Sequence, residues 1–360
     1  MLRKSTVSLN LGNTGKLNQL RAYVKEYAKV VQSYIDILWE QEMFTGSFIS
    51  KEIQDQADTW LGSVSKQCAG KQALAIIKSQ RRKPEEKRTK PEFKGNSLDL
   101  NVNIVMISDG DNFFDLWIKF RCLGNHIVFE IPAKKHKHFN KFETWTRKKS
   151  ARLKISTKGK FYLDIFFEKE QPELKQIGNT IGIDCGFNKL LVTSDGQFLG
   201  TEFPEIVKKI QRKLQGSNAF KRALVERDQY VDRVVKQLDL TPIKAVVVED
   251  LKGIKQNGKR HTKKFNNKNQ RWVYPRILNR LNQHCEVVGV QYHSVDPSYT
   301  SQICSMCGFT HKENRTGQFF RCRSCGYTSD SDLNASKNIL NRFIFQEATE
   351  PGQQVSSLVC

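Results

Sequence analysis

Two closely spaced cysteine pairs carry the most specific chemistry in this sequence. Cys304 and Cys307 form the first CxxC pair, and Cys322 and Cys325 form the second after fourteen intervening residues. Each pair can hold one edge of a tetrahedral metal ion, and His311 is an alternative ligand only if one cysteine is spared. The spacing favours a structural Zn²⁺ site without an open position for water over a redox pair or unrelated thiols.

Three carboxylates stand where separate elements are expected to end or begin. Asp184 ends one apolar strand, Glu249 ends a second, and Asp332 begins a helix. Carboxylates from neighbouring strands and a helix can hold two Mg²⁺ ions about 3.5–4 Å apart, with Mn²⁺ as an alternative, for phosphodiester cleavage. Each acid alone is more often a turn residue or a helix cap, and Asp250 and Asp330 compete for the same roles. The ordered set of three predicts a catalytic metal site.

The charge balance indicates a polyanionic partner. The 360 residues contain 59 Lys and Arg against 37 Asp and Glu, a formal net charge of +22, and the basic residues occur in every region. Nucleic acid is favoured over a membrane surface because no basic helix has a strong apolar face. The alternative is a basic protein whose charges are simply solvated.

Two basic segments supply the candidate phosphate contacts. The segment 78–94 carries eight basic residues and can also be a solvated linker, and the helical span after residue 204 is basic at its start. We expect both to contact nucleic-acid phosphates. The candidate residues are Arg81, Arg82, Lys83, Lys87, Arg88 and Arg212.

Membrane insertion and secretion are not expected. No apolar run approaches the roughly 20 residues of a transmembrane helix, and the N-terminus lacks the apolar region of a signal peptide. We therefore expect an intracellular, cytoplasmic protein that associates with the nucleoid when bound to DNA. The five cysteines outside the paired cluster then suit reduced thiols.

Hydrophobic periodicity predicts a helical and a strand-rich region in the first half. A strand at 2–10 precedes a long amphipathic helix at 17–38, where apolar residues recur at steps of three and four, and a second helical stretch at about 52–80. Five short strands between 98 and 167 predict a β-barrel-like domain, which the N-terminal strand can join.

The second half alternates between strands and helices. Buried strands at 180–184 and 243–250 flank a hairpin and a helical span, 204–240, that is interrupted near residue 216. A basic loop at 252–271, a helix at 272–284 and a strand at 286–292 lead to the cysteine pairs. The basic loop is expected to order only when an anion binds.

Four motifs resemble a known family. The runs Ile181-Gly182-Ile183-Asp184 and Val248-Glu249-Asp250-Leu251, the stretch around the first cysteine pair (300–308) and the helix start 332–339 are similar to the RuvC-type nuclease motifs and zinc insert of TnpB proteins. These are transposon-encoded ancestors of the type V CRISPR effectors. The resemblance covers about 180–342, is looser over the strand-rich region, and rests on layout alone in the first 90 residues.

The resemblance implies a multidomain α/β and β protein built around an RNase H-like (RuvC) nuclease domain with a zinc-ribbon insert. The implied domains are a wedge strand (1–12), a helical recognition lobe (13–88), a β-barrel wedge domain (89–172), the nuclease domain (173–303 and 326–342), the zinc insert (304–325) and a weakly structured tail (343–360).

The resemblance also implies an activity. A guide RNA would direct Mg²⁺-dependent cleavage of double-stranded DNA beside a short motif, with Asp184, Glu249 and Asp332 as the metal-binding triad and base pairing reading the target. Arg315 lies near the arginine that the family carries in its zinc insert, where it would assist catalysis. Alternatives are a miniature CRISPR effector, an RNA-guided repressor that does not cut, and a protein-only junction resolvase.

Overall fold

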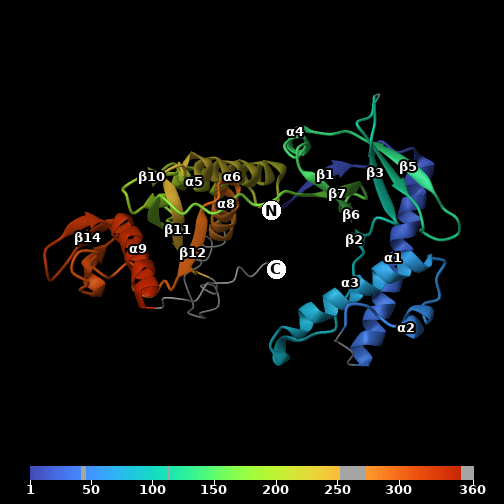
Figure 1. The fold of residues 1–360 in the computed structure, drawn as a ribbon, viewed down its shortest axis with the longest axis horizontal. Coiled ribbons are helices and arrows are strands. Elements are labelled where there is room, and N and C mark those ends of the chain that lie inside the picture. The colour runs from blue at the N-terminus through green and yellow to red at the C-terminus, as the bar shows by residue number, and fades with distance from the viewer. Residues whose placement is uncertain (42–45, 112, 252–272, 350–360) are drawn as a thin grey trace. The chain divides into compact units, whose positions relative to one another are not determined.

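The computed structural model describes residues 1–41, 46–111, 113–251 and 273–349, and it divides into two compact units. The first unit spans Met1–Glu170 and the second spans Gln171–Cys360 (Figure 1). The basic loop predicted at 252–271 lies outside the described residues. No helix in the described ranges is both long and apolar enough to cross a membrane.

Two antiparallel sheets form the strand-rich part of the first unit. One sheet has four strands in the order β1-β7-β6-β2, and the other has three in the order β3-β4-β5. The N-terminal strand joins the first sheet as predicted, with Val7 opposite Leu163. The strands are β1 (Leu2–Ser8), β2 (Ser97–Leu100), β3 (Val105–Asp109), β4 (Leu116–Phe120), β5 (Phe129–Ala133), β6 (Thr146–Ile155) and β7 (Phe161–Glu168).

The two sheets do not close into the predicted β-barrel within the described residues. The register of β6 against β7 shifts between Arg147 and Ala151, at the point where β6 faces the second sheet. Arg147 joins the two sheets by side-chain contacts, donating to the carbonyl of Ile107 at 3.3 Å and pairing with Asp109 at 2.6 Å. The sheets therefore meet through a side chain rather than through a continuous backbone ladder.

The helices of the first unit share one core with its sheets. The amphipathic face predicted at 17–38 is buried along α1 (Thr14–Glu40), and its side chains belong to the same continuous apolar cluster as the buried strand residues. The predicted second helix is split into α2 (Lys51–Asp55) and α3 (Ser63–Arg81) by a non-helical stretch. Gly62, the last residue of that stretch, donates its N–H to the carbonyl of Leu123 at 2.9 Å. The short helices η1 (Glu85–Lys87) and α4 (Lys137–Asn140) complete the unit.

A mixed five-stranded sheet organises the second unit, in the order β10-β9-β8-β11-β12. The strands β8, β11 and β12 are parallel, with β12 at one edge of the sheet, and β9 and β10 extend the other side as antiparallel strands. The strands are β8 (Asn179–Asp184), β9 (Leu191–Thr193), β10 (Phe198–Leu199), β11 (Ile243–Glu249) and β12 (Gln291–Val295).

Helices cover both faces of this sheet. The helices α5 (Phe203–Gln211), α6 (Asn218–Gln237) and α8 (Tyr274–Val288) share one apolar cluster with β8 and β11. Alternate residues of the strands face the other way, where Val247 and Val295 pack against α9 (Ser331–Thr349). The parallel strands are thus apolar on both faces, which explains their nearly continuous hydrophobic runs.

Several predicted boundaries move for identifiable reasons. The interruption near residue 216 is confirmed, because Ser217 caps the start of α6. The helix α8 continues to Val288 and ends where Gly289 adopts a left-handed backbone with φ of 69°, so β12 begins later than predicted. The helix α9 continues to Thr349, so residues 343–349 of the predicted weakly structured tail (343–360) are helical, and the rest of that tail lies outside the described residues.

A small cysteine-containing module precedes α9. It contains the 3-10 helix η2 (Lys312–Asn314) and a three-stranded sheet in the order β13-β14-β15. The strands are β13 (Arg315–Thr316), β14 (Phe319–Arg321) and β15 (Thr328–Asp330). Because β15 runs directly into α9, this module and Asp332 are joined without a linker.

Candidate metal centres and nucleic-acid contacts

The parallel pairing of β8 with β11 places two of the predicted acids together. Val248 lies opposite Ile183 in the ladder, so Glu249 and Asp184 follow at the carboxyl ends of adjacent strands. Carboxyl ends of parallel strands meet at one edge of a sheet, which is where open α/β sheets carry their sites. The sheet therefore brings together two residues that are 65 positions apart in the sequence.

The third acid reaches this edge because α9 packs very closely on β8. A Cβ added at Gly182 would lie 2.2 Å from the carbonyl oxygen of Ser336 and 2.7 Å from the N of Leu340, so only glycine permits the approach. At Gly186, just after β8, an added Cβ would lie 3.6 Å from Asp332 Oδ2. The Asp332 carboxylate therefore lies beside the end of β8.

The role of helix cap falls to Asp330, not to Asp332. Asp330 Oδ1 accepts the N–H of Asp332 at 3.0 Å and the N–H of Leu333 at 3.3 Å, as a capping carboxylate does. This removes the alternative interpretation of Asp332 as a simple cap. The Asp332 side chain, with the residue 5% exposed, faces the other acids instead.

The surroundings of Asp184 and Glu249 disfavour the ionisation of both carboxylates. Burial raises the pKa of Asp184 well above its usual range, and the charges of Glu249 and Asp332 raise it further. Burial also raises the pKa of Glu249, against the lowering effects of the Thr300 hydroxyl and of the Arg342 and Arg315 charges. Clustered carboxylates with raised pKa values form a site whose negative charge a bound cation would stabilise.

Two cations already lie against Asp332. Arg315 Nη2 is 3.1 Å from Asp332 Oδ1, and Lys189 Nζ is 3.4 Å from Asp332 Oδ2. The family resemblance pointed to Arg315 as a catalytic assistant, and the structure places its guanidinium against Asp332; the assistant role stays a prediction. No sequence pattern pointed to Lys189, which is one of many lysines and stands 143 residues from Asp332.

Two hydroxyl groups hold Glu249. The Thr300 hydroxyl donates to Glu249 Oε1, and the Tyr274 hydroxyl donates to the main-chain carbonyl of Glu249 at 2.6 Å. Sequence reasoning assigned no role to either residue, although Thr300 begins the motif that precedes the first cysteine pair. These bonds fix both the backbone and the side chain of Glu249 at the end of β11.

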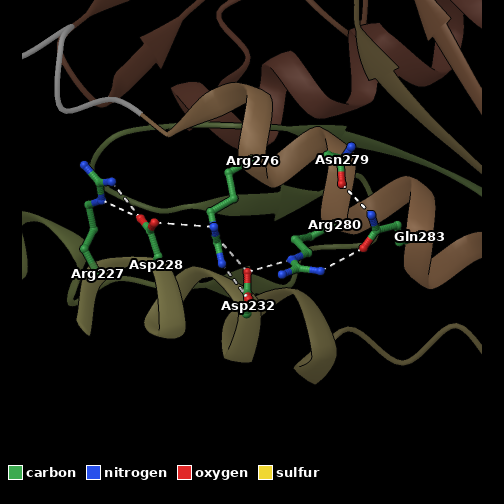
Figure 2. A network of polar contacts seen from close by, with 7 residues as sticks. All are labelled: Arg227, Asp228, Asp232, Arg276, Asn279, Arg280 and Gln283. Carbon is green, nitrogen blue, oxygen red and sulfur yellow. Dashed lines mark hydrogen bonds and ion pairs between the residues drawn. The ribbon is translucent and has the colours of Figure 1, made fainter. Parts of the chain in front are cut away.

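The helix that carries Tyr274 is itself fixed by ion pairs to α6. Figure 2 shows Arg276 and Arg280 of α8 converging on Asp232 of α6. Arg276 makes a bidentate contact with Asp232, at 2.9 Å and 2.7 Å, and Arg280 Nε adds a bond of 2.9 Å. Asp228 pairs with Arg276 at 3.4 Å. Bidentate pairs of this kind hold an arginine in a defined geometry. They fix α8 against α6 within two turns of Tyr274.

The donor set of the acidic site suits hard divalent cations. In the part of the chain that the structure describes, no three acids have carboxylate oxygens that all lie within 4.8 Å of one another. A pair of ions divides its carboxylates between two centres, so such a site does not require all donors around one point. The oxygen-only chemistry and the mutual repulsion of the acids fit Mg²⁺ or Mn²⁺.

The four cysteines form a separate group that could hold a metal ion. Their sulfur atoms all lie within 4.8 Å of one another. The Sγ atoms of Cys304 and Cys325 are 3.8 Å apart and those of Cys307 and Cys322 are 3.6 Å apart. A tetrahedral Zn²⁺ with bonds of about 2.3 Å requires sulfur separations of about 3.8 Å, so the sulfur positions already match that geometry.

Backbone amides stabilise the thiolate of one of the four cysteines, Cys322, whereas the pKa values of Cys304 and Cys307 are raised. Burial acts to raise the pKa of Cys322, but the N–H groups of Cys325 and Ser324 and the neighbouring thiols outweigh it and lower the pKa to about 6. His311 is not needed as a ligand, since its Nδ1 accepts the N–H of Glu313 at 3.2 Å. A lowered thiolate pKa is what metal ligation requires.

Comparisons with known proteins find similar proteins for parts of this chain. The family model described as "Cas12f1-like, TNB domain" matches residues 274–339, which include α8, the four cysteines and Asp332. The "Putative RNA-guided DNA endonuclease InsQ" of Escherichia coli (strain K12) is 30% identical over 219 residues, covering 51% of this chain and 54% of that protein. The matches support the TnpB family.

Two further matches are to CRISPR-associated proteins. The "CRISPR-associated endodeoxyribonuclease Cas12f1" of Sulfoacidibacillus thermotolerans is 38% identical over 95 residues, 26% of this chain and 21% of that protein. A cryo-EM structure of a Cas12f1–sgRNA–target DNA complex has the same fold, with a TM-score of 0.59 at 15% identity, covering 91% of this chain and 83% of that one. The chain matches about half of the length of InsQ and about a fifth of the length of the Cas12f1 protein from Sulfoacidibacillus thermotolerans.

The predicted phosphate contacts divide between the two units of the chain. Five of them lie at the end of α3 and around η1, where four are exposed and Arg81 is half-buried beside the Trp39 ring. Arg212 is exposed in the second unit, just after α5. The first-unit residues thus form one exposed basic segment, whereas Arg212 belongs to a separate basic surface. Their contact with nucleic acid stays a prediction.

Proposed function

We propose that the chain is an RNA-guided double-stranded DNA endonuclease of the TnpB type, which hydrolyses phosphodiesters at a target beside a short adjacent motif. The observation that carries this proposal is the meeting of Asp184, Glu249 and Asp332 from two strands and a helix. The names of the matching relatives, InsQ and Cas12f1, support the same activity.

The three acids would hold two Mg²⁺ ions, which supply an activated water and stabilise the leaving oxygen. Each supporting residue then has a defined task. Thr300 and Tyr274 orient Glu249, and Asp330 fixes the helix start that carries Asp332. Arg315, which contacts Asp332 directly, is placed to neutralise charge that develops on the cleaved phosphate.

The four cysteines would hold a structural Zn²⁺. All four positions of the tetrahedron are filled by sulfur, so this ion has no open site for water. Its module contributes Arg315 on β13 and leads through β15 into α9. The zinc would therefore act on catalysis indirectly, by keeping Arg315 and Asp332 in register.

The proposed partners are a guide RNA and double-stranded target DNA. The net charge of +22 matches a long polyanionic duplex, and base pairing with the guide would supply sequence recognition. A miniature type V CRISPR effector is the second candidate, because the Cas12f1 relative is 38% identical over the region it shares with this chain. A non-cutting repressor is less favoured, since all three acids are present and brought together.

Two measurements test the proposal. Sequencing of the RNA that copurifies with the protein separates the two candidates: a transposon-end transcript indicates the TnpB type, and a repeat-spacer guide indicates a CRISPR effector. With the guide identified, Asp184→Ala should abolish cleavage of a target plasmid and leave RNA-dependent DNA binding intact. Retained cleavage by this variant would overturn the catalytic assignment, and cleavage of four-way junctions without RNA would favour a resolvase.

A further inference from the structure

A single lysine lies inside the acidic site. Lys189 Nζ is 2.5 Å from Asp330 Oδ2 and 3.4 Å from Asp332 Oδ2, and its side chain is only 14% exposed. The ring of Phe198 closes the other side, with its centroid 5.1 Å from the ammonium. Lysine is rarely buried to this extent unless its charge is paired, so the position indicates a specific role.

The two carboxylates that Lys189 contacts differ in the other hydrogen bonds that they make. Asp330 uses Oδ1 to cap α9 and has only Oδ2 left for the ammonium, so it stays in place whatever else binds. Asp332 has no capping role, and its oxygens face Arg315 on one side and Lys189 on the other. Lys189 is therefore firmly held by Asp330 and more weakly shared with Asp332.

We propose that Lys189 is an internal counter-ion that competes with a divalent cation for Asp332, an inference that rests on the proposed metal site. The ammonium offsets the repulsion between the clustered carboxylates when no divalent cation is bound. Binding of such a cation adds a third positive centre to the Asp332 carboxylate, which already contacts Arg315 and Lys189. The longer contact with Lys189, at 3.4 Å, then weakens while the pair of Lys189 with Asp330 persists.

This arrangement has a measurable thermodynamic consequence. A lysine that stabilises the protein without divalent cations, and opposes their binding, is coupled negatively to the metal. Removal of the ammonium should therefore lower the melting temperature in divalent-free buffer and strengthen the binding of Mg²⁺. Removal of a lysine that only supported the fold would leave Mg²⁺ binding unchanged, and removal of one that only positioned Asp332 for metal binding would weaken it.

The test compares Lys189→Met, Lys189→Arg and wild-type full-length protein, freed of nucleic acid, in Mg²⁺ titrations followed by thermal unfolding and calorimetry. We expect Lys189→Met to melt at a lower temperature without Mg²⁺ and to bind Mg²⁺ roughly fivefold or more tightly. Lys189→Arg, which keeps the charge, should bind as wild type does. The control Lys208→Met removes an exposed lysine paired with Glu205 at 2.7 Å and should change neither quantity.

The outcomes separate this inference from the proposed function. Unchanged or weaker Mg²⁺ binding in Lys189→Met overturns the counter-ion role. If Asp184→Ala shows the same Mg²⁺ response as wild type, the metal site itself is wrong and the counter-ion role falls with it. If Lys189→Met does not fold, tighter Mg²⁺ binding by Lys189→Gln supports the role, and binding equal to wild type refutes it.

Discussion

The close packing of α9 on β8 gives the sharpest test of how this fold builds its acidic site. Gly182→Ala places a Cβ 2.2 Å from the carbonyl oxygen of Ser336 and 2.7 Å from the N of Leu340. Both atoms belong to the backbone of α9, so no side chain can move aside, and the helix must shift away from the strand. Asp332 stands one turn earlier on the same helix and must shift with it.

The magnitudes follow from overpacking and from catalytic geometry. Forcing extra atoms into a packed interface costs about 1–3 kcal/mol, which in a unit of this size lowers the melting temperature by roughly 2–12 °C. A displacement of about 1 Å at a catalytic group costs about 100-fold in rate. Cleavage should therefore fall by far more than the small loss of folded protein explains.

The assay measures plasmid cleavage with the cognate guide RNA, guide-dependent DNA binding, and thermal unfolding of the same samples. Gly15→Ala is the matched control, because a Cβ there lies in ordinary contact, 3.6 Å from Asn13 Oδ1, near the start of α1. Gly182→Ala should retain DNA binding and lose cleavage, and Gly15→Ala should retain both. Wild-type cleavage and melting temperature in Gly182→Ala would refute the close-packing argument.

Three further changes test the supports of the two centres. Thr300→Val removes the hydroxyl that lowers the pKa of Glu249 against the effect of burial, so this pKa should rise further. The acidic limb of the cleavage pH profile should therefore move to higher pH. An unchanged limb would contradict the assigned hydrogen bond. Cys322→Ser should lower bound zinc measured by mass spectrometry from one equivalent towards none, and cleavage should fall with it. Asp232→Asn weakens the clamp on α8 and should destabilise the protein by about 1 kcal/mol in denaturant unfolding, whereas Glu226→Gln, at an exposed pair, should have little effect.

The periodic elements of the chain were within reach of sequence reasoning. The 3.6-residue period of α1, the apolar runs of β8 and β11 and the break between α5 and α6 are local patterns, and the structure reproduces them. Boundaries were less accessible because they depend on single residues. The end of α8 is decided by the left-handed Gly289, and the extension of α9 to Thr349 follows a face that is only partly apolar.

The expected β-barrel failed for a tertiary reason. Strand patterning shows which residues face a core, but closure of a sheet depends on strand tilt and register. The register shift in β6 and the side-chain bridge from Arg147 to β3 leave two sheets, which no alternation of apolar residues in the sequence reports.

The sequence by itself identified the residues of both candidate centres. The cysteine spacing predicted a tetrahedral sulfur site, and the three acids predicted a site with oxygen ligands, because the type of each ligand and its local spacing can be read directly from the sequence. Only the tertiary structure decided how these acids are supported. Thr300, Tyr274 and Lys189 reach them across 51, 25 and 143 residues, respectively, where no local pattern connects the partners. The parallel register of β8 and β11 and the close approach of α9 at Gly182 bring the three acids together. Both depend on packing rather than on composition.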